Sequence, residues 1–142
     1  MLSSTEIKQA LRAAGFEVFQ TQGGAVHVAE RVRENLILDS GIRVRCDGPV
    51  VVIHARAQRS DFPGEAPEQL FRRARDLAGA AVERGYAEAA AHVSDVTDPS
   101  DPAAVIDSWY QVTYEKTVPN VPAMLDEVRF ALGIERTARR AA

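Results

Sequence analysis

The chain has 142 residues, the length of one domain, and its 46% hydrophobic and 26% charged residues are typical of a globular protein rather than a disordered or fibrous one. The only cysteine, Cys46, excludes an internal disulfide framework, and a net charge of −3 provides no positive field that would gather nucleic acid or anionic membrane. There is no signal peptide and no apolar run approaching the roughly 20 residues that cross a bilayer, so we expect a cytoplasmic protein without membrane insertion.

The N-terminal sequence predicts a helix over residues 4–14. Ser3 and Glu6 have the spacing of a capping box, in which each side chain accepts a hydrogen bond from the backbone amide of the other residue. Ile7 and the apolar residues that follow it lie on one face at helical spacing. Gly15 is typical of the left-handed residue that ends a helix.

Between residues 17 and 59 the period of the apolar positions changes from about 3.6 to 2, which predicts strands. A Gln22-Gly23-Gly24 turn indicates a hairpin at the start of this region. From Val26 to Cys46 the apolar residues fall on even positions, so one face of these strands should be buried. The alternation is interrupted between residues 30 and 40, where we expect a bend or a bulge. A helix over residues 29–39 is the alternative, because the apolar residues there are also spaced by four.

A turn at Asp47-Gly48-Pro49 precedes a predicted strand of high β-propensity over residues 50–57. The odd positions of this strand should face the core, which places Val50 and Val52 on the opposite side. Residues 67–84 then carry a broad apolar stripe at helical spacing, with a proline in the first turn and a glycine after the end. We therefore expect one central helix there.

The C-terminal half is predicted to contain two strands and a helix. The alanines of residues 86–96 favour a helix, but their alternating pattern after a glycine favours a strand, and we predict a strand. A connector rich in proline and aspartate, residues 97–102, precedes a long strand over residues 105–118. Asn120 caps the last helix. Residues 135–142 are predicted to be a frayed tail.

The predicted order is one helix, three or four strands, a helix, two strands and a last helix, all within one domain over residues 3–134. A run of strands interrupted by a single helix argues against a doubly wound parallel sheet, which needs regular alternation of strands and helices. The sequence therefore predicts an α+β fold, in which a twisted antiparallel sheet carries its helices on one face.

This order, written α-β-β-β-α-β-β-α, resembles the fold of the type III secretion chaperone family and of the related YbjN-type bacterial proteins. The similarity includes the Gly15-Phe16 end of the first helix and the Gly85-Tyr86 break after the central helix, and it covers residues 3–134. The resemblance implies a non-enzymatic, chaperone-like homodimer that binds protein segments along apolar surface, without catalytic residues or a cofactor. The arginine-studded strands depart from the acidic composition usual in secretion chaperones.

Three histidines, His27, His54 and His92, lie on predicted strands. A zinc site or a small enzyme built on them is the alternative to a binding module. No local ligand pair such as HExxH or CxxC accompanies them, so we interpret them as separate residues of the sheet. Cys46 is predicted to be a core residue because it lies on the apolar face of its strand. The aspartates between residues 95 and 107 are interpreted as a solvated connector, since their spacing is not that of a calcium-binding loop.

Arginines on the odd-numbered face suggest a binding surface. If the strands pair, Arg43 and Arg45 form a basic stripe on this face, which Arg56 extends, and the stripe is able to bind acidic protein. No nucleic-acid-binding motif accompanies the stripe, so a nucleic-acid partner is not expected. The alternative is that these arginines pair with acidic residues of the same chain on a solvated face.

Trp109, the only tryptophan, is predicted to complete this surface. It is opposite in phase to Tyr110, so it should face away from the core, although a shift of one residue would bury it instead. Tryptophan and arginine dominate interface hot spots. Apolar residues on an uncovered sheet face predict a homodimer, and the expected partner is a protein segment with apolar and acidic side chains. The predicted partner-binding residues are Trp109, Val52, Arg43, Arg45 and Arg56.

Overall fold

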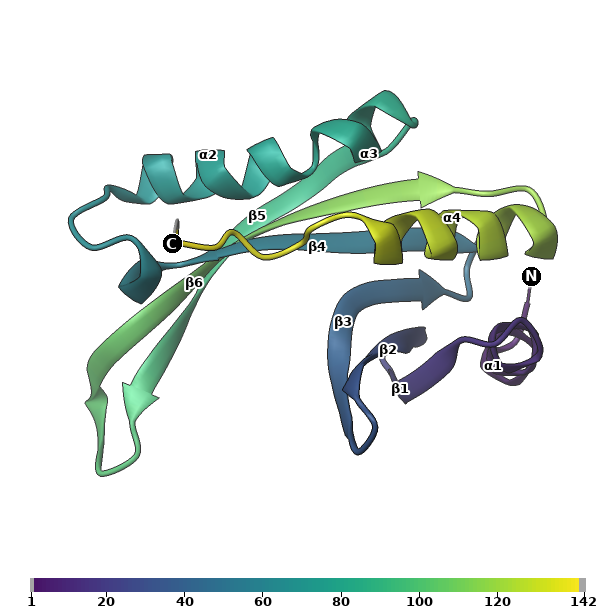
Figure 1. The fold of residues 1–142 in the computed structure, drawn as a ribbon, viewed down its shortest axis with the longest axis horizontal. Helices are drawn as coiled ribbons and strands as arrows, with labels where there is room; N and C mark the ends of the chain where they lie inside the picture. Colours follow the sequence, from purple (N-terminus) through teal and green to yellow (C-terminus); the bar gives the residue numbers. More distant parts are fainter. Residues whose placement is uncertain (1, 141–142) are drawn as a thin grey trace. The chain divides into compact units, whose positions relative to one another are not determined.

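Six strands form one antiparallel sheet in the computed structural model, which describes residues 2–140 (Figure 1). The elements along the chain are α1 (Ser4–Ala13), β1 (Glu17–Gln22), β2 (Ala25–Arg33), β3 (Leu36–Arg45), β4 (Val50–Gln58), the 3-10 helix η1 (Arg59–Asp61), α2 (Pro67–Leu77), α3 (Gly79–Glu83), β5 (Ala87–Asp98), β6 (Asp101–Thr117) and α4 (Val121–Gly133). The strand order is β1-β2-β3-β4-β6-β5, so β1 and β5 are the edges of the sheet. The predicted α+β fold is confirmed, with four strands before α2.

The described residues form two compact units. The first contains residues up to Ile53 together with residues 115–134, and the second contains residues 54–114 together with the C-terminal segment from Glu135. Strands β4 and β6 contribute to both units. Within residues 2–140, no helix is both long enough and apolar enough to span a membrane.

In the first unit, α1 begins with the predicted capping box. The amide of Glu6 donates to Ser3 Oγ at 3.1 Å, and the amide of Ser3 donates to Glu6 Oε1 at 3.1 Å. Gly15 follows the helix with φ of 91°, the left-handed conformation expected at this end. The core of this unit lies between the helices and the even-numbered face of the strands, and its fully buried members include Ile7, Leu11, Val26, Val28, Ile42, Val44, Met124 and Val128.

Residues 29–33 and 36–39 are strand rather than helix, with a turn at Glu34 and Asn35 between them, and a further irregularity is a β-bulge. The β2–β3 register shifts between Val28 and Ala29, opposite a segment in which Gly41 has φ of 80°. The Ser40 hydroxyl donates to the Val28 carbonyl at 2.6 Å and accepts from the Ile42 amide at 3.1 Å. The side chain of Ser40 thus supplies hydrogen bonds that the ladder loses at the bulge.

In the second unit, α2 packs on the sheet through an apolar cluster made of Ala57, Phe62, Leu70, Tyr110 and Ala138. The expected single helix over residues 67–84 is divided at Ala78, whose amide bonds back only three residues, to the Arg75 carbonyl at 3.1 Å. Gly79, which follows, has low helix propensity, so this tightened turn separates α2 from α3.

The expectation of a frayed tail is wrong for the described part of residues 135–142. The amide of Arg56 donates to the Arg136 carbonyl at 2.9 Å, and the amide of Ala138 donates to the Arg56 carbonyl at 2.8 Å. Ala138 is buried in the apolar cluster of the second unit. The pairing of β3 with β4 ends at Ile53, and the tail satisfies backbone groups of β4 beyond that point. Residues 141–142 lie outside the described part.

Residues 86–96 form strand, as predicted, but the expected connector over residues 97–102 is mostly strand as well. β5 and β6 are joined by a turn of only Pro99 and Ser100. Asp98 Oδ1 accepts hydrogen bonds from the amide of Ser100 at 2.9 Å and from its hydroxyl at 2.8 Å. This Asx-type bonding shortens the connection and extends both strands into a long hairpin (Figure 1).

Candidate protein-binding surface

Trp109 and Arg56 are neighbours in the second unit. Trp109 is half-buried on β6, while Tyr110 beside it is 7% exposed, so the predicted register of this strand is confirmed. The guanidinium carbon of Arg56 lies 4.9 Å from the centre of the Trp109 ring. This cation–π contact joins adjacent strands β4 and β6.

Val52 does not lie on an open surface, and that part of the predicted site is wrong. Val50 and Val52 are each only 5% exposed. Val52 is the cross-strand partner of Arg43, which in turn is the partner of His27. Because partners on neighbouring strands share one face, long polar side chains lie beside the valine and cover it with their apolar stems.

Arg43 belongs to a part-buried polar cluster in the first unit rather than to an open basic stripe. It forms two hydrogen bonds with Asp39, from Nη1 to Oδ1 at 2.5 Å and from Nη2 to Oδ2 at 2.8 Å. His27 Nδ1 lies 3.2 Å from Gln20 Nε2 and 3.8 Å from Asp39 Oδ2. The bulge at Gly41 presents Asp39 to this cluster, and the amide of Gly41 donates to Asp39 Oδ1 at 3.0 Å.

The cluster sets the protonation of its two titratable members. Burial lowers the pKa of His27, and the neighbouring Arg43 charge lowers it further, against the opposite effect of Asp39. Burial alone would raise the pKa of Asp39, but its hydrogen bonds with Arg43 and Gly41 outweigh burial and lower that pKa. The neutral imidazole and the ionised carboxylate are therefore the stable forms near neutral pH.

Two other arginines of the first unit, Arg45 and Arg31, also pair with acidic residues. Arg45 Nη1 donates to Glu115 Oε2 at 2.6 Å, and Arg45 Nε donates to Asp47 at 3.2 Å. Arg31 Nε likewise donates to Glu17 Oε1 at 2.8 Å. These contacts agree with the alternative interpretation, in which the sheet arginines pair with acidic residues of the same chain.

The three histidines have separate surroundings. His27 is in the cluster just described, His54 Nδ1 lies 2.9 Å from Thr113 Oγ1, and His92 is exposed on β5. In the described part of the chain, no group of three His, Cys, Asp or Glu residues is placed to hold a metal ion. Cys46 is half-buried, not a full member of the core as expected.

Asp107 anchors the end of β4 to β6, a role that the sequence does not indicate. Its carboxylate accepts from Gln58 Nε2 at 2.5 Å, from the Ser60 amide at 3.0 Å, from Ser60 Oγ at 2.7 Å and from the Ser108 amide at 2.8 Å. Burial alone would raise the pKa of Asp107, but these hydrogen bonds outweigh it and lower the pKa. No short-range pattern links Asp107 to residues nearly 50 positions earlier.

Among the residues that the structure describes, the exposed large apolar side chains lie in three places. One group, in the first unit, consists of Phe19, Val32, Ile37 and Leu38, and we call it the β1–β3 patch. Val82 is alone on α3. The remaining group consists of Val93, Val96, Val105 and Ile106, on the hairpin of β5 and β6. Ile106 and Tyr110 are four residues apart on β6, a spacing that places both on one face of a regular strand, but Ile106 is 55% exposed because α2 does not cover this end of β6.

No protein-family model matches the chain, and no match is found among curated proteins or solved structures. The resemblance to the type III secretion chaperones therefore stays an expectation. What the surface can bind is inferred from its own residues.

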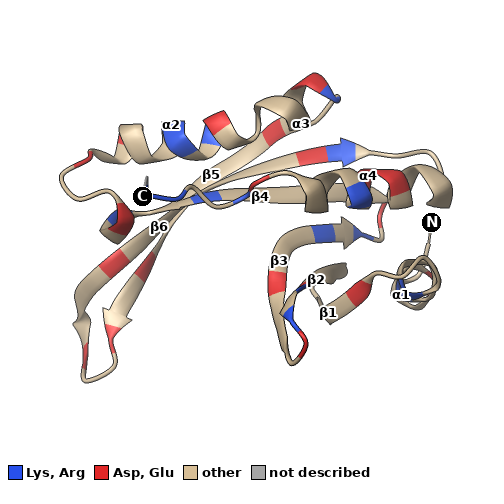
Figure 2. Ribbon diagram, viewed as in Figure 1, with Lys and Arg blue, Asp and Glu red and all other residues tan. Residues whose placement is uncertain are grey.

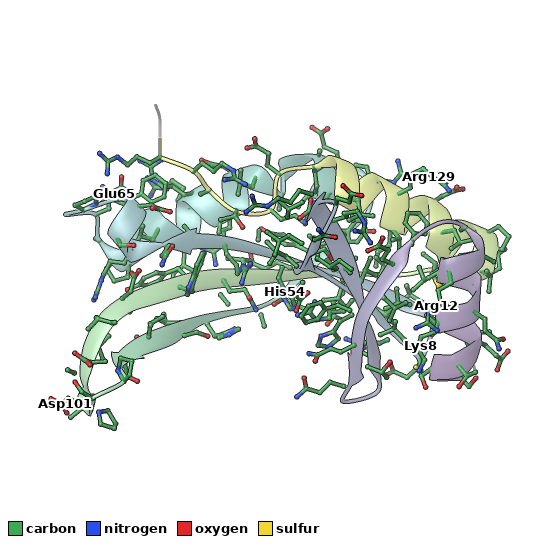
Figure 3. All side chains as sticks on the ribbon, turned by 60° about the horizontal axis from the view of Figure 1, so that its bottom comes forward. Lys8, Arg12, His54, Glu65, Asp101 and Arg129 are labelled. Atoms are coloured by element: carbon green, nitrogen blue, oxygen red, sulfur yellow. The ribbon has the colours of Figure 1, made fainter. Side chains whose placement is uncertain are left out.

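The hairpin of β5 and β6 is uniformly acidic over residues 87–106, which we call the acidic hairpin. This segment contains Glu88, Asp95, Asp98 and Asp101 but no lysine or arginine. Figure 2 shows only acidic colouring along it, and Figure 3 labels Asp101 at its tip. The acidic hairpin therefore differs in charge from the basic surface that was predicted around Arg43, Arg45 and Arg56, which lie on β3 and β4.

Proposed function

We propose that this protein is a non-catalytic protein-binding module that contacts its partner through the acidic hairpin. The observation that carries the proposal is the exposure of the apolar side chains Val93, Val96, Val105 and Ile106 on one structural element. Exposed apolar residues grouped on one element mark interaction sites, whereas single exposed apolar residues are ordinary in soluble proteins.

The construction of the hairpin supports the same function. β4 ends at Gln58, which is hydrogen-bonded to Asp107, so residues 101–106 of β6 have β5 as their strand neighbour but no further β4 residues to pair with. A two-stranded ribbon is only marginally stable in water when neither face is covered. Every residue of β5 from Ala87 to Thr97 is exposed. A partner that covers the hairpin would supply the apolar contacts that the chain itself does not make.

The β1–β3 patch is proposed as the surface through which two copies associate. Val32, Ile37 and Leu38 are between 41% and 55% exposed. The surrounding charges have both signs, with Glu30 and Arg31 adjacent in the sequence of β2. In a two-fold interface the same patch meets itself, so a patch of mixed charge is able to pair opposite signs. The acidic hairpin, by contrast, would place like charges together.

Paired substitutions test the binding function. Ile106→Asp places a charge in the acidic hairpin, and Val82→Asp places the same charge on α3, at a residue that is similarly exposed at 52% against 55%. Complexes are captured by chemical cross-linking in an extract of the cells that make the protein, and the abundance of each discrete adduct is compared with that of the unaltered chain. We expect Ile106→Asp to reduce adduct formation about tenfold, and Val82→Asp to leave it unchanged.

The proposal is contradicted if Ile106→Asp leaves adduct formation intact, or if both variants reduce it equally. Circular dichroism of the two variants checks that both remain folded, so that a loss of binding reports the surface rather than the fold.

A further inference from the structure

We propose that the partner is an extended, basic and apolar protein segment that adds as a new strand to the free edge of β5. This inference rests on the proposed binding function and names the class of partner. The recognition is by backbone hydrogen bonds along the edge, apolar contacts with the exposed valines and charge attraction to the acidic hairpin.

The two edges of the sheet differ in how well they are protected. β1 has six residues and an irregular register between Val18 and Gln20, and its last four residues include three polar ones. Short length, bulges and polar residues are the means by which proteins prevent strands from adding to an edge. β5 has twelve residues, about 40 Å at the usual rise per residue, and contains no proline, lysine or arginine. The open edge is therefore β5.

The side chains of β5 leave room for an added strand. Ala87, Ala89, Ala90 and Ala91 occupy most of its first half, and all are exposed. Side chains this small do not block the approach of another backbone, and they allow larger apolar residues of the incoming strand to fill the space beside them. Val93 and Val96, which are 44% and 37% exposed, extend the apolar contact along the second half.

Charge decides which kind of strand fits. The acidic hairpin carries four carboxylates and no lysine or arginine. Glu88 is paired with Arg75 of α2, which leaves Asp95, Asp98 and Asp101, and the last two lie together at the tip. A second copy of β5 would bring further carboxylates to the same edge, where like charges on neighbouring strands destabilise pairing. A segment in which lysine or arginine alternates with apolar residues would instead place opposite charges together. The favoured occupant is a basic segment of another protein, not a second copy.

The probe is a synthetic, fluorescently labelled nine-residue peptide in which lysine alternates with valine and threonine. Two control peptides accompany it, one with glutamate in place of lysine and one of the same charge with two central residues replaced by proline. We expect fluorescence anisotropy to show binding of the lysine peptide, and about tenfold weaker or no binding of both controls, because the edge needs both charge complementarity and backbone donors. Hydrogen exchange should slow at amides of β5 when the lysine peptide is added.

Matched variants locate the site. Ala91→Lys adds a charge to the β5 edge, and Ala80→Lys adds the same charge at an exposed alanine of α3. We expect Ala91→Lys to weaken binding of the lysine peptide about tenfold and Ala80→Lys to have little effect. Equal binding of the proline peptide, equal effects of the two variants, absence of protection in β5, or failure of the lysine peptide to bind would each overturn the proposal.

Three outcomes separate this proposal from its alternatives. If Ala91→Lys converts a dimer into a monomer, measured by light scattering, then a second copy occupies the edge and the proposed partner is wrong. If the lysine peptide fails but Ile106→Asp still removes cellular adducts, the binding function stands and only the edge recognition is lost. If Ile106→Asp changes nothing in the cellular test, the proposed function itself fails.

Discussion

Asp107 and His27 show how single buried polar residues determine the behaviour of this sheet. Asp107 accepts four hydrogen bonds from groups on β4, η1 and β6, and it is 9% exposed. His27, also 9% exposed, lies between Gln20 and the Asp39–Arg43 pair. The aromatic residue Trp109 also depends on a contact that is distant in sequence. Its ring faces away from the core, and Arg56 covers one side of it. Each residue acts through contacts that are distant in sequence.

Replacing Asp107 by alanine is expected to lower the free energy of unfolding by about 3 kcal/mol, since hydrogen bonds to a charged group contribute roughly 1.5–3 kcal/mol and the donors would be left unpaired. Its lowered pKa means that the folded state holds its proton less tightly than the unfolded state, so this contribution is present above about pH 4 and is lost as the pH falls below that. Urea denaturation at pH 7 measures the effect. Asp101→Ala, at an exposed residue, is the control and should change little. A neutral result for Asp107→Ala would show that its hydrogen bonds contribute little.

His27 is expected to make the fold sensitive to mild acid. Because its pKa is lowered by burial and by Arg43, the folded state disfavours the imidazolium. The stabilisation by neutral His27 is complete above the ordinary histidine pKa of 6.5 and is lost as the pH falls through the lower value in the folded state. Urea denaturation at pH 7.5 and pH 5.5 should show a smaller acid-induced loss for His27→Gln than for the unaltered protein. An equal loss in both proteins would assign the effect to other groups.

At the scale of elements, the departures from regular structure have identifiable causes. The bulge in β3 requires a left-handed residue at Gly41, and the break between α2 and α3 occurs at Ala78, just before Gly79. The C-terminal tail bonds to both the amide and the carbonyl of Arg56 on β4. In each case, backbone hydrogen bonds are satisfied by a local rearrangement rather than by continuing the helix or the ladder.

The two glycines are expected to respond in opposite directions to the same substitution. Gly41→Ala should lower the free energy of unfolding by about 1–2 kcal/mol, because the backbone at this position has φ of 80°, which disfavours a Cβ atom. Gly79→Ala should raise stability by about 0.5–1 kcal/mol, since a Cβ there meets nothing within 4 Å and glycine weakens helices. Thermal and urea denaturation of both variants measure the difference. Destabilisation by Gly79→Ala would show that this position has a further constraint.

The packing of the tail is tested at Ala138, which is 6% exposed. Ala138→Asp would bury a charge in the apolar cluster of the second unit, so we expect the free energy of unfolding to fall by about 2 kcal/mol or more. Ala80→Asp, at an exposed position of α3, is the control and should have a small effect. If Ala138→Asp is also neutral, the tail does not pack in solution.

At the scale of the whole molecule, the uncovered apolar residues predict assembly. The β1–β3 patch and the acidic hairpin differ in charge, which is mixed in the patch and of one sign in the hairpin. The difference favours a second copy at the patch and a different, basic partner at the hairpin. The basic stripe that the sequence suggested does not serve either purpose, because Arg43 and Arg45 are engaged in ion pairs.

Light scattering at micromolar concentration should give twice the chain mass of 15.5 kDa. Leu38→Asp, in the β1–β3 patch, should shift the mass to that of a single chain, because an unpaired charge would be buried in the interface. Ile106→Asp, in the acidic hairpin, is the matched control and should leave the dimer intact. A single-chain mass for the unaltered protein would contradict the homodimer.

The sequence by itself determined the features that depend on near neighbours. The sequence shows the capping box of Ser3 and Glu6, the left-handed Gly15 and the alternation that favours strand over helix between residues 29 and 39. These features are readable because helix caps and strand periodicity involve residues within a few positions of one another. The α+β class follows from the order of these elements.

Only the tertiary structure decided which surfaces are open. Val52 is buried on a strand whose pairing places Arg43 beside it and His27 beside Arg43. Ile106 is exposed because β6 extends beyond α2, the helix that covers Tyr110. Alternation shows which of the two faces of a strand a residue lies on, but it does not show which other parts of the chain cover that face. What covers a face depends on strand order, bulges and strand length, because these bring together residues that are far apart in the chain. For this reason the candidate site is the acidic hairpin and not the basic strands that the sequence suggested.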